Sequence, residues 1–379
     1  MPRFFIVLLA LCSGLALPAY SAKIEVSADN PGPEINPAMW GLFLEDINFG
    51  ADGGLYAELI KNRGFEFPNA LQGWDMLRGW AAQGEVTVRE DQPFNARNPH
   101  YIRIRSAAKM PIGVMTQGFR GIGVRKSDKY AFSARVRKVQ GSPMLRVQLY
   151  GGDGDLLASQ SFTNLPDDWS KLSASLEAKD TDAKCVLQVV ILGEGTVDLD
   201  FVSLFPEATW KNRSGGLRAD LVQVLADLHP GFLRFPGGCI IEGNVLATRY
   251  QWKNTIGPVE ERPLQVSRWN DSSMNRATPD YYQSFGLGFF EYFQLCEDVG
   301  AQPLPVLNCG IACQLKSGEL CALEDLQSYI QDTLDLIEFA NGPASSVWGP
   351  QRQLDLATTT IKNRHNQAEL LRVVGLREW

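Results

Sequence analysis

The chain has 379 residues, a formal net charge of −7 and seven cysteines. That length allows two or three domains. The acidic balance argues against a nucleic-acid partner, which normally meets a basic surface, and it suits a neutral ligand better than a phosphate. The cysteines are irregularly spaced, which is not typical of the disulfide framework of a small secreted domain.

The first 22 residues have the pattern of a secretory signal peptide. Arg3 precedes the apolar run FFIVLLALCSGLAL, and the small residues Ser21 and Ala22 suit a cleavage site. An uncleaved membrane anchor is the alternative interpretation. This apolar run is too short for it, because a membrane-spanning helix needs about 20 residues. We therefore expect a secreted or periplasmic protein without a stable membrane span.

The next distinctive stretch predicts a buried strand with an acidic end. Residues 39–44 are almost all apolar, which is typical of a strand buried on both faces. The apolar run stops at Glu45 and Asp46. Strand ends of this kind are where α/β enzymes place their chemistry.

A glycine-rich loop and a helix are expected to follow this strand. Residues 55–60 supply an apolar helical stripe, with Asp52 as the expected N-cap and Gly64 as the expected C-terminal stop. The stretch therefore predicts one strand–loop–helix unit.

Residues 72–205 have the alternating pattern of antiparallel β-strands. The clearest runs are HYIRIRS, YAFSARVRK, MLRVQLYG, CVLQVVILG and VDLDFVSLF, and GGDGD at residues 151–155 fits a hairpin turn. We expect a jelly-roll-like β-sandwich. Its tryptophans, Trp74, Trp80 and Trp169, fit either the core or a stacking surface for a sugar, and the core is the more common role.

Helices and strands alternate after residue 205, which predicts a parallel sheet. A long irregular loop over 239–279 interrupts the pattern, and loops of this length are typically functional or disordered. The expected elements are a helix over 217–228, a strand over 232–235, a helix over 286–299, a strand over 303–308 and a helix over 324–340.

Three expected parallel strands end in polar residues: Glu45, Arg234 followed by Cys239, and Asn308. In a barrel these ends share one face, so a carboxylate, a guanidinium and an amide would surround a neutral polyhydroxyl ligand, with Trp252 and Trp269 in a nearby loop. A structural salt bridge between Glu45 and Arg234 is the alternative interpretation.

The cysteines and histidines do not predict a cofactor. Cys239 fits a small buried residue as well as a ligand contact. A disulfide from Cys309 to Cys313, or from Cys313 to Cys321, remains open in an oxidising compartment. We expect no metal, because the three histidines are scattered and no regular CxxC spacing occurs, and no nucleotide fingerprint is present.

Four segments resemble the α-L-arabinofuranosidases of glycoside hydrolase family 51. They are GLFLEDINFGADGGLYAELIKNRGFEF, GFLRFPGGCIIEGN, SFGLGFFEYFQLCEDVGAQPLPVLNCG and IEFANGPASSVWG. The resemblance covers about residues 24–349 and implies a (β/α)8 TIM-type barrel with an inserted carbohydrate-binding-like sandwich. It also implies that Glu45 and Cys239 contact an arabinofuranosyl group and that Arg234 supports the site.

The resemblance implies two catalytic glutamates that the sequence does not contain. Such enzymes hydrolyse with retention, using an acid/base in a Gly-Asn-Glu motif and a nucleophile on a later strand, and neither motif occurs here. The stretch from Trp210 to Trp379 is also shorter than the about 250 residues of a full barrel. We therefore expect an incomplete barrel in a truncated or frameshifted copy, with no catalytic glutamate in this chain.

The predicted organisation has five segments. They are a signal peptide over 1–22, the first barrel strand and helix over 23–70, a β-sandwich over 71–207, a partial barrel over 208–350 and an aberrant tail over 351–379. The implied activity is the release of terminal non-reducing α-L-arabinofuranosyl residues from arabinan, arabinoxylan or arabino-oligosaccharides, without a cofactor. A non-catalytic protein that binds arabinose-containing glycans is the alternative.

Overall fold

The computed structural model describes residues 23–67, 75–107, 110–270 and 280–352. The chain divides into two compact units, residues 1–39 and residues 40–379. The described part of the first unit is mostly exposed and contains one short 3-10 helix, η1 (Pro37–Met39). The predicted signal peptide and nearly all of the predicted tail lie outside the described residues. Among the described helices, none is both long and apolar enough to cross a membrane.

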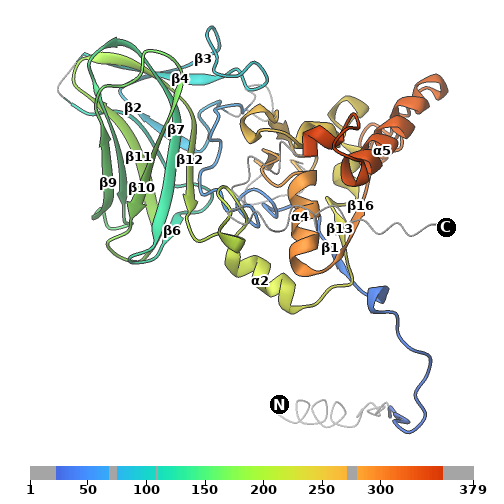
Figure 1. Cartoon of the computed structure of the whole chain (residues 1–379). Coiled ribbons are helices and arrows are strands. Elements are labelled where there is room, and N and C mark those ends of the chain that lie inside the picture. Colours follow the sequence, from blue (N-terminus) through green and yellow to red (C-terminus); the bar gives the residue numbers. More distant parts are fainter. Residues whose placement is uncertain (1–22, 68–74, 108–109, 271–279, 353–379) are drawn as a thin grey trace, which may run out of the picture. The chain divides into compact units, whose positions relative to one another are not determined.

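Two antiparallel sheets within the second unit form a β-sandwich (Figure 1), as the alternating pattern predicted. One sheet has the strand order β10-β7-β12-β4-β3, and the other has the order β2-β5-β11-β8-β9, with β6 paired to β11. The strands are β2 (Trp80–Gln83), β3 (Glu85–Arg89), β4 (Tyr101–Ser106), β5 (Ile112–Thr116), β6 (Ile122–Val124), β7 (Lys129–Gly141), β8 (Met144–Tyr150), β9 (Leu156–Phe162), β10 (Ser170–Glu177), β11 (Asp182–Leu192) and β12 (Gly195–Pro206).

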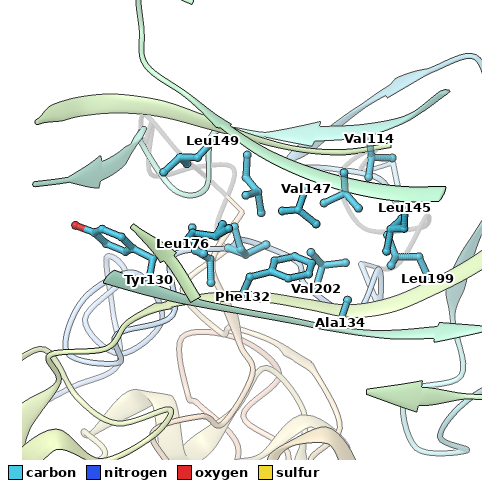
Figure 2. Close-up of a cluster of buried hydrophobic side chains, with 14 of the residues drawn as sticks. Val114, Tyr130, Phe132, Ala134, Leu145, Val147, Leu149, Leu176, Leu199 and Val202 are labelled. Atoms are coloured by element: carbon cyan, nitrogen blue, oxygen red, sulfur yellow. The ribbon is translucent and has the colours of Figure 1, made fainter. Parts of the chain in front are cut away.

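The sandwich core lies between these sheets. Figure 2 shows side chains of the two sheets pointing toward one another, among them Phe132 and Val147, which are almost completely buried. The predicted hairpin after β8 is confirmed, because the Gly151 amide donates to the Asp155 carbonyl at 2.9 Å. Trp80 belongs to this core, and Trp169 donates to the Gln92 carbonyl from a half-buried position. Trp74 lies outside the described residues.

The remainder of the second unit is built on a short parallel sheet with the order β1-β13-β16. Most expected elements after residue 205 are confirmed. The strands are β1 (Leu42–Phe43), β13 (Phe232–Phe235) and β16 (Gln302–Pro305), with an antiparallel pair β14 (Gln265–Val266) and β15 (Tyr282–Gln283). The helices are α2 (Ala219–Asp227), α3 (Cys239–Glu242), α4 (Phe289–Val299) and α5 (Leu326–Asn341). The 3-10 turns are η2 (Trp210–Asn212), η3 (Leu246–Thr248), η4 (Trp252–Thr255), η5 (Val259–Glu261) and η7 (Leu323–Asp325).

The parallel sheet is packed on one face. Phe235 of β13 stacks on Tyr292 of α4, with ring centroids 4.6 Å apart. On the other face, Phe43 and Leu304 are 53% and 47% exposed. The prediction that residues 39–44 are buried on both faces is therefore wrong, since the described residues cover only one side of this sheet.

The helix predicted over residues 52–64 is also absent, although this stretch is described completely. Almost every side chain from Leu55 to Ile60 is buried, so the segment has no solvent-facing side of the kind an amphipathic surface helix needs. Its backbone bonds to distant segments instead: Leu59 donates to the Leu204 carbonyl at 2.9 Å, and Ala57 donates to the Gly216 carbonyl at 3.2 Å. Tertiary contacts thus override the local pattern.

Candidate functional site

The Glu45 carboxylate is held by the turn that follows β13. Its Oε1 accepts hydrogen bonds from the Ile240 amide at 3.1 Å and the Gly238 amide at 3.4 Å. The backbone supports this contact, because the Leu44 amide donates to the Arg234 carbonyl and the Asp46 amide to the Pro236 carbonyl, both at 2.9 Å. Two of the predicted residues, Glu45 and Cys239, therefore come together at the carboxyl ends of neighbouring parallel strands.

A buried pair of carboxylates lies behind Glu45. Asp46 accepts from the Ala51 amide at 3.2 Å, and Asp52 accepts from the Ser284 amide at 2.8 Å and from the Ser284 hydroxyl. Burial, reinforced by the charge of Asp52, raises the pKa of Asp46 to about 7. The expected capping role of Asp52 is wrong, because its carboxylate binds Ser284 rather than the start of a helix.

Arg234 lies on the open face of the parallel sheet. Its guanidinium carbon is 4.7 Å from the centroid of the Phe43 ring, which is a cation–π distance. In the described structure no ion pair joins Arg234 to Glu45, so the salt bridge of the alternative interpretation is not formed. The two side chains are therefore not paired with each other in the described structure.

Asn308 organises the loop after β16. Its amide nitrogen donates to the carbonyls of Ile241 and Ile311 at 3.1 and 2.9 Å, and its oxygen accepts from the Gly310 amide at 2.7 Å. These bonds tie the loop after β16 to the helix α3. The substrate contact expected for Asn308 stays a prediction, and the observed role of its side chain is to position the loop.

A group of ligand-type atoms surrounds Cys239. The Cys239 and Cys313 sulfurs and a Glu242 carboxylate oxygen all lie within 4.8 Å of one another. Arg268 donates to the Cys313 sulfur at 2.8 Å, and its Nε and Nη1 are buried without a hydrogen-bond partner in the described part of the chain. Three such ligand atoms can attract a soft cation, but the neighbouring guanidinium charge opposes one.

The two tryptophans expected near the ligand have different environments. Trp252 is only 1% exposed and donates to the Asp332 carbonyl at 2.9 Å, so it belongs to the core and the expectation of a ligand contact is wrong. Trp269 is half-buried, with the Arg268 guanidinium 4.2 Å from its ring centroid. Of the two, Trp269 alone therefore remains near the strand-end site, the group formed by Glu45 and Cys239 at the carboxyl ends of β1 and β13.

A hollow lies beside the five-stranded sheet of the sandwich. It has a volume of about 760 Å³, and its lining includes Ser133, Ser173 and Glu260. Its aromatic lining residues are all buried, so none offers a ring face on which a sugar could stack. They are Tyr56, Phe132, Phe201 and Phe205. The strand-end site is the better candidate for sugar binding.

Sequence patterns missed Arg268 and Glu242 as members of this group. Arg268 lies in the long loop after β13, where no periodicity predicts which side chain turns inward. The available signal was the length of that loop and its content of tryptophan and arginine. The convergence of Arg268 with Cys313, 45 residues away, required the structure.

Comparison with known proteins identifies two families along the chain. The family described as "Alpha-L-arabinofuranosidase 1 domain" matches residues 224–355, and the family described as "Carbohydrate binding domain" matches residues 57–193. An extracellular exo-alpha-L-arabinofuranosidase of Streptomyces chartreusis is 39% identical over 350 residues, covering 88% of this chain and 40% of that relative. Alpha-L-arabinofuranosidase 1 of Arabidopsis thaliana is 34% identical, covering 88% of this chain and 49% of the relative.

A solved structure supports the same relationship. The arabinose-bound α-L-arabinofuranosidase MgGH51 aligns with a TM-score of 0.75 and 33% identity, over 86% of this chain and 52% of that chain. The chain spans about half the length of the curated relatives it matches. The chain thus shares the fold of about half of a family 51 arabinofuranosidase, and a carbohydrate-binding-type β-domain is part of it, as the sequence motifs predicted.

Proposed function

Because the chain is related to the family 51 α-L-arabinofuranosidases over most of its length, we propose that it supplies the sugar-binding part of such an enzyme. The activity of the lineage is retaining hydrolysis of terminal non-reducing α-L-arabinofuranosyl residues. The substrate would be arabinan, arabinoxylan or an arabino-oligosaccharide. The alternative of a protein evolved only to bind glycans is not favoured, since the curated relatives are named as arabinofuranosidases.

The observation that carries this proposal is the position of the Glu45 carboxylate. Backbone amides on both sides of Cys239 bind its Oε1, which fixes the carboxylate at the strand ends and leaves Oε2 free of described protein partners. A half-buried carboxylate accepts strong hydrogen bonds from sugar hydroxyls. Glu45 and Cys239 would contact the arabinofuranosyl group, with Arg234 and Asn308 supporting the site.

We also propose that the parallel sheet is an unfinished barrel. In the described residues β1 and β16 are edge strands, each paired on one side only. The exposed Phe43 and Leu304 lie in one row with Arg234, on the face that would point into a closed barrel. Further strands would cover these side chains and remove both open edges.

The proposed binding site does not provide hydrolysis by itself. Retaining chemistry needs a nucleophile and an acid/base whose carboxyl groups lie about 5 Å apart across the scissile bond. Glu45 and Asp46 are consecutive and have different surroundings, since Glu45 reaches the β13 turn and Asp46 is buried against Ala51. They do not form such a pair, so turnover requires the two glutamates whose motifs the sequence lacks.

The partner of this site is an arabinose-containing plant glycan outside the cell. One relative is named as extracellular, and the first residues of this chain have the pattern of a signal peptide. The site offers a carboxylate and a thiol to a neutral sugar, and the acidic chain has no basic surface composition that would favour a nucleic acid.

Calorimetric titration with an arabino-oligosaccharide, alongside an assay with p-nitrophenyl α-L-arabinofuranoside, tests the proposal. We expect the purified chain to bind the sugar without turnover, and Glu45→Gln to weaken binding at least about tenfold through loss of charged hydrogen bonds. Glu324→Gln, at an exposed acidic residue in η7, is the matched control. Unchanged affinity in Glu45→Gln, or turnover that survives this substitution, would refute the site.

A further inference from the structure

Two thiols from distant parts of the sequence meet beside the candidate sugar site. Cys239 begins the four-residue helix α3 after β13, and Cys313 lies in the loop after β16. Their sulfurs are within 4.8 Å of one another, and both are free thiols in this structure. A disulfide needs an S–S distance of about 2 Å, so the two side chains must turn toward one another for the bond to form.

Arg268 makes this pair of thiols different from the other cysteines. Its side chain is 4% exposed, and its Nη2 donates to the Cys313 sulfur at 2.8 Å. Two further guanidinium nitrogens of Arg268, Nε and Nη1, have no hydrogen-bond partner in the described part of the chain. Burial raises the pKa of the Cys239 thiol, and the charge of Arg268 opposes that rise, so Arg268 favours the thiolate, which is the reactive form of cysteine.

We propose that Cys239 and Cys313 are a modification site that forms an intramolecular disulfide on exposure to a disulfide oxidant such as oxidised glutathione. This inference does not depend on the proposed sugar binding. It selects one pairing over Cys309 to Cys313 and Cys313 to Cys321, which the sequence left open. A divalent metal at the same atoms is disfavoured by the charge of Arg268.

Accessibility sets the order of the steps. Cys239 is half-buried and reachable, whereas Cys313 is only 1% exposed. The Cys239 thiol loses its proton to solvent, and its thiolate attacks oxidised glutathione to give a mixed disulfide and one glutathione thiolate. The Cys313 thiolate, having lost its own proton, then attacks the Cys239 sulfur and expels the second glutathione. Two protein thiols lose two electrons, and one oxidised glutathione becomes two reduced molecules.

The cross-link would join the turn after β13 to the loop after β16. It closes a long loop of sequence, which restricts the unfolded chain and raises the melting temperature. It also consumes the Cys239 thiol between the two amides that hold Glu45. The oxidised chain would therefore be more stable and have an altered strand-end site.

Peptide mapping by tandem mass spectrometry tests the proposal on the purified chain treated with oxidised glutathione. We expect a cross-linked peptide joining Cys239 to Cys313, and a melting temperature that falls when dithiothreitol is added. Cys313→Ser should trap glutathione on Cys239, whereas Cys239→Ser should leave Cys313 unmodified because it is buried. Cys309→Ser, at an exposed thiol in the same loop, is the control and should still form the cross-link.

Three results would overturn the proposal. They are a cross-link that joins Cys313 to Cys309 or Cys321, the persistence of both free thiols after oxidation in the unmodified chain, and a glutathione adduct on Cys313 in Cys239→Ser. The mapping of the unmodified chain is decisive even if a variant fails to fold. None of these measurements depends on arabinose binding. A chain that forms the disulfide but does not bind arabinose would contradict the proposed function and leave this inference intact.

Discussion

Gly237 and Glu45 approach so closely that a Cβ atom on Gly237 would lie 2.5 Å from the Glu45 Cγ. Gly237 also has a φ of +149°, a region that residues with a side chain rarely adopt. The β13 turn therefore needs glycine at this position, both for its own conformation and for the carboxylate that it holds.

Gly237→Ala should displace the Glu45 side chain and lower the arabinose affinity of the chain about tenfold. The reason is that a contact this short forces one partner to move, which breaks hydrogen bonds from Gly238 and Ile240 that are made to a charged group. Isothermal titration with an arabino-oligosaccharide measures the effect. Gly123→Ala on β6 has open space around its new methyl group and should bind like the unmodified chain. Equal affinity in all three proteins would contradict the expectation.

Asp198→Ala should destabilise the sandwich by about 3 kcal/mol or more, because it leaves two arginines without their shared partner. Asp198 is completely buried and pairs with Arg103 at 2.7 Å and with Arg137 at 2.5 Å. Urea denaturation monitored by circular dichroism measures the change. Asp167→Ala removes an exposed partner of Lys138 and should cost less than about 1 kcal/mol. Similar costs for the two variants would show that burial does not govern these ion pairs.

The sandwich was the most predictable part of the fold. Its strands alternate inward and outward side chains, and β8 shows this directly, since Leu145, Val147 and Leu149 are all buried in the core. A period of two fixes both the element and the face that it buries. The hairpin turn at residues 151–155 could also be predicted from the sequence, because its glycines and aspartates suit a tight turn.

The stretch around the candidate site was harder to predict, for a physical reason. Residues 55–60 are buried by partners from distant segments, so an apolar pattern with helical spacing arose without a helix. The strand ends were found from the break between apolar and charged residues at Glu45. The contact between Arg268 and Cys313 depends on how a long loop folds back, and local sequence carries no signal of that path.

Asp46→Asn should remove a pH dependence of stability that arises from this buried carboxyl. Burial and then Asp52 raise the pKa of Asp46 from 3.8 to about 7, so the folded chain binds the proton more tightly than the unfolded chain. The stability contributed by the protonated carboxyl is complete below about pH 4 and is lost as the pH rises to 7. Above pH 7 the variant should exceed the unmodified chain by a few kcal/mol, because each tenfold change in proton affinity between the folded and unfolded chain corresponds to about 1.4 kcal/mol.

Urea denaturation of both proteins at pH 5 and pH 8 measures this difference. Asparagine keeps an oxygen that can accept from the Ala51 amide, so the substitution changes the charge with little change of shape. Asp167→Asn, at an exposed position, should follow the unmodified chain at both pH values. A stability difference between Asp46→Asn and the unmodified chain that is the same at pH 5 and pH 8 would exclude titration of Asp46 as its cause.

Replacing Phe43 and Leu304 together by threonine should reduce self-association of the chain. These side chains are 53% and 47% exposed and flank Arg234 across the open face of the parallel sheet. Exposed apolar faces and unpaired strand edges promote contacts between copies. Threonine retains a preference for β-strands, so the change removes apolar surface while the sheet is kept. The cation–π contact of Phe43 with Arg234 is lost, at a cost of about 1 kcal/mol or less.

Light scattering on a concentration series provides the measurement. The unmodified chain should show an apparent mass that rises with concentration, and the Phe43→Thr, Leu304→Thr double variant should show a smaller rise. Val139→Thr with Leu156→Thr removes comparably exposed apolar side chains from the sandwich and should not reduce the association. A monomeric mass for the unmodified chain throughout the series, or an equal reduction in the control pair, would argue against the open sheet face as the contact surface. A reduction confined to the Phe43→Thr, Leu304→Thr variant would place the contact between copies at the open face of the parallel sheet.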